Sequence, residues 1–102
     1  MQLHTIKLPI ATNDGASYGE ALAGFENDAL VLAGGYTSLP LQQGAWRDPK
    51  SGTVYKEWVQ PYEVACDADT WADLVNCAFR LFPDQLAIFT ADLGTADILE
   101  RP

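Results

Sequence analysis

A chain of 102 residues has room for one domain, 1–102, and its composition excludes several kinds of protein. Hydrophobic residues make up 48% and charged residues 20%, which is typical of a folded domain and unlike a disordered chain. Fourteen acidic and six basic residues give a formal net charge of −8, so we expect no nucleic-acid partner, because phosphates would meet net repulsion.

The sequence shows no targeting segment, metal motif or cofactor motif. Met1 is followed by neither a signal-peptide pattern nor an apolar run long enough to span a bilayer, so we expect a cytoplasmic protein without a membrane partner. Cys66 and Cys77, with a single histidine, cannot complete a four-ligand zinc site. We therefore expect reduced thiols, no metal site and no cofactor.

The first third of the chain predicts a strand followed by a helix. Alternation over Leu3–Ile10 has the period of a strand. Ser17 and Glu20 have the spacing of a capping box that begins a helix, and Gly34–Gly35 ends it. A glycine inside this helix, Gly24, predicts close packing of its backbone. The apolar stripe expected to face the core comprises Tyr18, Leu22, Phe25, Ala29 and Leu32.

The middle third predicts a β-hairpin. Residues 36–41 and 44–48 are expected to form one bent strand, interrupted by Pro40 and Gly44. A five-residue turn, Asp48–Gly52, leads to a long strand over Thr53–Ala65. Both faces of this hairpin carry large apolar side chains, so part of it is expected to pack against something beyond the core of one chain.

The last third predicts a second helix and a last strand. Asp67 is a candidate N-cap, and apolar residues recur at helical spacing from Trp71 to Phe82. Residues 85–91 are apolar on both faces, which predicts a central strand. Residues 92–102 are expected to form a tail, with a short strand or a helical turn at 96–99.

This order of elements predicts an α+β fold of the ferredoxin-like βαββαβ type, a four-stranded antiparallel sheet with two helices on one face. The other face of the sheet would be bare. Since its expected residues, Leu3 among them, are too apolar for open water, we predict a homodimer that closes through sheet faces or edges.

A family resemblance supports this layout. The pattern Gly-Gly-Tyr-Thr, Gly-Ala-Trp-Arg-Asp and Gly-x-Val-Tyr-x-Glu, within residues 34–64, resembles small bacterial proteins of unassigned activity, some of them carried on mobile gene cassettes. The layout is also similar to the dimeric α+β barrel and ACT-like groups. The resemblance implies a fold and transfers no catalytic residue.

The candidate site residues concentrate in the hairpin. The two strands of the hairpin are expected to carry Arg47, Asp48, Lys56 and Glu57, and opposite charges on neighbouring strands can form a rim ion pair. The alternative is a pocket for a small anionic or planar ligand, in which Glu57 or Glu63 would act as a base if burial raised its pKa. The residues proposed for a ligand site or a subunit interface are Trp46, Arg47, Tyr55, Glu57, Trp58 and Tyr36.

His4 is the only imidazole and therefore a candidate general base or haem ligand, although a histidine at a strand end with one edge in solvent is the favoured interpretation. Three functions stay open. The first, which we favour, is a small dimeric domain that is not an enzyme and that binds a partner protein or small ligand through the hairpin face. The others are a cofactor-independent isomerase or monooxygenase of the dimeric α+β barrel kind, and an acidic inhibitor of a basic protein.

Overall fold

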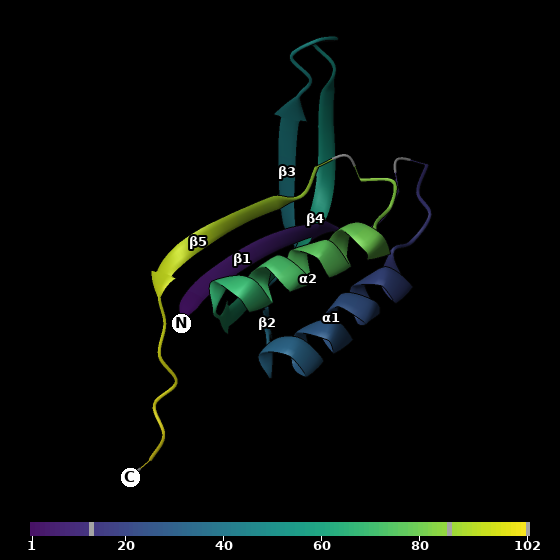
Figure 1. The fold of residues 1–102 in the computed structure, drawn as a ribbon. Helices are drawn as coiled ribbons and strands as arrows, with labels where there is room; N and C mark the ends of the chain where they lie inside the picture. Colours follow the sequence, from purple (N-terminus) through teal and green to yellow (C-terminus); the bar gives the residue numbers. More distant parts are fainter. Residues whose placement is uncertain (13, 86, 102) are drawn as a thin grey trace.

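The chain, whose residues 1–12, 14–85 and 87–101 are described by a computed structural model, folds into an antiparallel sheet with two helices on one face (Figure 1). The sheet has five strands in the order β2-β4-β1-β5, and β3 also pairs with β4. The ferredoxin-like prediction is therefore confirmed, with five strands in place of four. The elements are β1 (Gln2–Pro9), α1 (Gly19–Ala33), β2 (Thr37–Ser38), β3 (Gln42–Arg47), β4 (Val54–Cys66), α2 (Ala68–Leu81) and β5 (Phe89–Thr95).

The predicted bent strand is divided into β2 and β3, and both pair with β4. The ladders leave Gln60 and Pro61 of β4 between them, opposite the break at Pro40. Neither proline has an N–H to donate to a ladder. The Gln60 side chain fills the break instead, because its Nε2 donates to the carbonyl oxygens of Leu39 at 2.8 Å and of Pro61 at 2.9 Å.

Helix α1 ends as predicted but begins differently. Gly34 adopts φ 82°, and its N–H donates to the Leu30 carbonyl at 3.2 Å. The predicted Ser17–Glu20 capping box is wrong, because the N-cap is Tyr18 and no side chain caps it. Ser17 lies in an isolated bridge to Ala11, and its hydroxyl accepts from the nearby Gly19 N–H, at 3.0 Å, instead of from the Glu20 N–H that a capping box would use.

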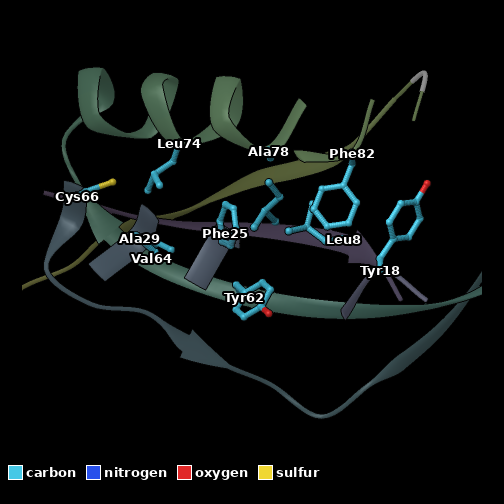
Figure 2. Packing of buried hydrophobic residues seen from close by; sticks show 11 residues of the cluster. Leu8, Tyr18, Phe25, Ala29, Tyr62, Val64, Cys66, Leu74, Ala78 and Phe82 are labelled. Carbon is cyan, nitrogen blue, oxygen red and sulfur yellow. The ribbon is translucent and has the colours of Figure 1, made fainter. Parts of the chain in front are cut away.

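The core lies between the two helices and one face of the sheet (Figure 2). Phe25 and Ala29 of the predicted α1 stripe are fully buried, whereas Leu32 in the last turn is exposed. A Cβ on Gly24 would lie 3.0 Å from Leu81 Cδ2, so the predicted close approach is made to α2. No helix in the described part of the chain is long and apolar enough to cross a membrane.

The second helix is confirmed, and the last strand is shifted. Asp67 caps α2 by accepting from the Thr70 N–H at 2.8 Å. The expected central strand over residues 85–91 is wrong: β5 begins at Phe89 and lies at the edge, beside β1 alone among the described strands. Gln85, where the strand was expected to begin, lies instead in a turn in which its N–H donates to the Phe82 carbonyl at 3.0 Å. Leu86 lies outside the described residues. The strand runs on to Thr95 in the region expected to be tail, and residues 96–101 form neither a strand nor a helix.

Candidate functional site

The hairpin of β3 and the first part of β4, residues 42–58, projects from the body of the protein, and we call it the arm (Figure 1). The molecule measures 55 × 26 × 24 Å along its principal axes. The last contact of the arm with the body is at Trp58, whose carbonyl oxygen accepts from the Ile10 N–H at 3.4 Å. Nearer the turn, the two strands of the arm pair only with each other among the described residues, since β1 does not pair beyond Val59 of β4. A two-stranded hairpin is marginally stable in water, so the arm is a candidate for packing against another molecule.

Large aromatic side chains cover the arm. Trp46 and Tyr55 are cross-strand partners whose rings stack with their centroids 4.8 Å apart and their planes 22° apart. Trp46 is 53% exposed, and Trp58 further along β4 is 50% exposed. Because monomeric proteins rarely leave this much aromatic surface in water, the arm has the composition of an interface.

The predicted rim ion pair does not form among the described residues of the arm. The register explains this result, because Lys56 lies opposite Ala45, Glu57 opposite Gly44 and Arg47 opposite Val54. The Arg47 side chain lies toward the turn instead, where its Nη2 would be 3.5 Å from a Cβ on Gly52. The predicted turn over Asp48–Gly52 is confirmed by the bond from the Gly52 N–H to the Asp48 carbonyl, at 2.8 Å.

Tyr36 does not join the arm, so the predicted pocket of Arg47, Trp46, Tyr55 and Tyr36 is not assembled within one chain. Tyr36 packs edge-on against Tyr62, with ring centroids 5.6 Å apart. Tyr62 lies seven residues from Tyr55 along the same strand, which corresponds to roughly 23 Å.

Tyr36 belongs instead to a cluster with Glu26 and Tyr62, which we call the carboxylate clamp. The hydroxyl of Tyr62 donates to Glu26 Oε2 at 2.5 Å, and that of Tyr36 donates to Oε1 at 3.1 Å. Burial raises the pKa of Tyr62 far above its ordinary value, and the Glu26 carboxylate adds to this shift. Sequence reasoning missed Glu26 and Tyr62, although Tyr62 alternates with the core residue Val64.

His4 is buried, which corrects the expectation of a solvent-facing edge. Its ring stacks on Trp71 of α2, with centroids 4.5 Å apart, and its Nδ1 lies 2.5 Å from Asp92 Oδ1 of β5. Its Nε2 has no hydrogen-bond partner in the described part of the chain. Because Asp92 is 70% exposed while His4 is 4% exposed, the pair joins the interior to the edge strand.

The side of the sheet opposite the helices, which we call the open face, is mainly apolar. His4 points to α2, so alternation places Leu3, Thr5 and Lys7 of β1 on the open face. Pairing adds the neighbouring residues of β4 and β5. The members from these two strands are Pro61, Glu63, Ala65, Phe89 and Ala91.

Two surface hollows lie away from the predicted site residues of the arm. One, of about 150 Å³, is lined by Tyr36, Glu63 and Ile98 among others. The other, of about 560 Å³, lies between the start of α1 and the end of α2. Neither hollow is lined by His4 or Glu57, the residues expected to face a cavity in an isomerase or monooxygenase.

The strand order and the two helices on one face define a small α+β domain of the ferredoxin-like class, extended by an arm. Solved structures share this arrangement. The divalent cation tolerance protein CutA1 of Thermus thermophilus is 18% identical, with a TM-score of 0.68 over 96% of this chain and 86% of that protein. A CutA1 mutant from Pyrococcus horikoshii is 12% identical, with a TM-score of 0.69 over 98% of this chain and 88% of that one.

CutA from Synechococcus elongatus is also similar, at 16% identity and a TM-score of 0.56 over 91% of this chain and 76% of that one. At these identities the likeness is one of fold. No family model and no curated protein matches the chain.

Proposed function

We propose that the protein is a homo-oligomeric binding domain, a dimer in its simplest form, in which the arm of one copy packs against a second copy. The observation that carries this proposal is the exposure of the arm's aromatic side chains on a ribbon that its own chain does not cover. The register places Trp46 and Trp58 on opposite faces of this ribbon, so covering both faces would remove both side chains from water and hold the strand pairing in place. The open face, which continues the same sheet, is the natural receiving surface.

The CutA1-type fold is consistent with such a domain, and the name of the Thermus protein connects that protein with divalent cations. In this chain, the described residues contain no group of three or more His, Cys, Asp or Glu side chains placed to hold a metal ion. Because the predicted pocket is not assembled within one chain, a small anionic or planar ligand at the arm would have to be bound between copies. Arg47 would supply the hydrogen-bond donors, and the stacked rings of Trp46 and Tyr55 would supply the apolar wall.

The experiment is sedimentation velocity on the wild type and on a Trp46→Ala, Trp58→Ala double variant at micromolar concentration. We expect the wild type to sediment as an oligomer and the double variant to associate at least on the order of tenfold more weakly, since exposed aromatic anchors dominate interfaces. Phe79→Ala is the matched control, because Phe79 is an exposed aromatic residue on the helix side. A monomeric wild type, or equal loss in the control, would contradict the proposal.

A further inference from the structure

The larger surface hollow has both polar and apolar walls. Its volume is about 560 Å³, and it is formed where the start of α1 meets the end of α2. Leu81 and Pro83 supply apolar surface, and Arg80 supplies a guanidinium group. A hollow that combines apolar walls with a few polar groups is the usual form of a small-molecule site. None of its lining residues belongs to the arm or to the open face.

The backbone at the start of α1 brings unpaired donors to this hollow. No side chain caps the helix, and the Gly19 N–H donates to the Ser17 hydroxyl at 3.0 Å. The N–H groups of Glu20 and Ala21, two residues that line the hollow, have no acceptor among the described residues. Free amides at the N-terminal end of a helix favour an anion.

A buried hydroxyl points to the same place independently of the helix end. Tyr18 lines the hollow and is only 8% exposed, and its hydroxyl has no hydrogen-bond partner in the described part of the chain. Its ring packs on Phe82 with centroids 4.9 Å apart, and Figure 2 shows the hydroxyl pointing away from the other labelled side chains. A buried hydroxyl without a partner is unfavourable, and a ligand that accepts from it removes that penalty.

The charges beside the hollow limit what kind of anion fits. The Nη2 of Arg80 donates to Cys77 Sγ at 3.1 Å, which is a weak acceptor, and no ion pair joins Arg80 to Glu20 in the described structure. The exposed carboxylate of Glu20 and the net charge of −8 disfavour a multiply charged anion such as phosphate. A carboxylate carries a single charge and accepts from several donors at once.

We propose that this hollow binds a small monocarboxylate that carries an apolar group. The carboxylate oxygens accept from the Tyr18 hydroxyl, from the free amides at the start of α1 and from Arg80. The apolar group lies against Leu81 and Pro83. This binding goes beyond the proposed self-association and does not depend on it, because the arm takes no part in the hollow.

The experiment is a titration of ¹⁵N-labelled protein with sodium isovalerate, followed by NMR at constant ionic strength. We expect saturable shifts of the Glu20 and Ala21 amide signals with a Kd on the order of 1 mM, as the few atoms of this probe allow. Isovaleramide has a similar shape without the charge, so it should bind at least roughly tenfold more weakly.

Three variants separate binding in the hollow from non-specific binding of salt. Tyr18→Phe and Arg80→Gln should each weaken isovalerate binding on the order of tenfold, because each removes a donor to the carboxylate. Glu20→Gln should strengthen it by roughly threefold, because it removes a like charge. Arg101→Gln is the matched control for Arg80→Gln, since it removes an exposed positive charge outside the hollow, and it should leave the Kd unchanged.

The free protein gives a second readout on the hydroxyl. Without isovalerate, the Tm of Tyr18→Phe should be no lower than that of the wild type, since the hydroxyl has no partner to lose. A purely structural role of Tyr18 would give the opposite pattern, a lower Tm with an unchanged Kd.

Each outcome decides the question. The inference is overturned if the two amides do not shift by about 50 mM isovalerate, if isovaleramide binds equally well, or if folded Tyr18→Phe binds as the wild type does. If circular dichroism shows that Tyr18→Phe does not fold, the opposite effects expected for Arg80→Gln and Glu20→Gln, both at exposed positions, decide in its place. Self-association is measured separately by sedimentation, so failure of carboxylate binding leaves the proposed function standing.

Discussion

Replacement of Tyr62 by phenylalanine tests the carboxylate clamp. The ring of Tyr62 is fully buried, packs against Phe25 with centroids 5.2 Å apart, and would keep this packing in Tyr62→Phe. The lost bond, 2.5 Å to Glu26, is of a kind that contributes about 1.5–3 kcal/mol. Because Glu26 is half-buried and water can reach part of it, we expect a loss near the lower end, about 1.5 kcal/mol.

For a domain of this size, that loss lowers Tm by roughly 6–12 °C, which differential scanning calorimetry at fixed protein concentration measures. Tyr36→Phe should cost less than Tyr62→Phe, because its bond is longer at 3.1 Å and its ring is less buried. Tyr55→Phe, on the exposed face of the arm, is the control for loss of a hydroxyl. A Tyr62→Phe variant as stable as this control would refute the reasoning.

The clamp also predicts how stability depends on alkaline pH. The pKa of Tyr62 is raised in the folded protein, first by burial and then by Glu26. Below the ordinary tyrosine value of about 10, both folded and unfolded states keep the proton and the clamp's contribution is complete. Above it, only the unfolded state releases the proton, so the free energy of unfolding should fall with rising pH. Denaturant titrations should show a smaller fall in Tyr62→Phe, and an equal fall in both proteins would contradict the assignment.

Two further predictions concern the packing of α1 and the edge strand. Gly24→Ala should be nearly neutral, because a helix-propensity gain of about 1 kcal/mol offsets the displacement of Leu81, whereas Gly24→Val should cost about 1–3 kcal/mol in denaturant titrations. Asp92→Ala should speed hydrogen exchange in β5 more than in β4, because it removes the partner of His4 and leaves a buried ring nitrogen unpaired. If β5 of the variant exchanged no faster than β5 of the wild type, the His4–Asp92 pair would not stabilise the edge strand.

Local patterns predicted the elements that depend on local chemistry. The Asp67 N-cap, the Gly34 helix end and the turn before Gly52 are where the sequence places them, because each uses a conformational preference of nearby residues. The Ser17 cap failed for a non-local reason, since a bridge to Ala11 holds that residue in an extended conformation.

The candidate site was predicted less completely than the fold. The exposed aromatic arm follows from the hairpin pattern, and Trp46 and Tyr55 do stack there. The clamp and the His4–Asp92 pair join residues 36 and 88 positions apart in the chain, so no local pattern contains them. They depend on the pairing of β5 with β1 and the packing of α1 on β4, which only the three-dimensional structure supplies.

The use of one strand, β4, by both the arm and the body has a consequence for how the protein can vary. The β3 ladder ends at Val59 and the body ladder to β2 begins at Tyr62, so insertions nearer the turn leave the body's pairing untouched. Adding two residues to each strand would lengthen the arm by roughly 7 Å and keep every side chain on its present face. Adding one residue to each would exchange the two faces beyond the insertion. The reach of the arm is thus adjustable in steps of two residues without redesign of the core.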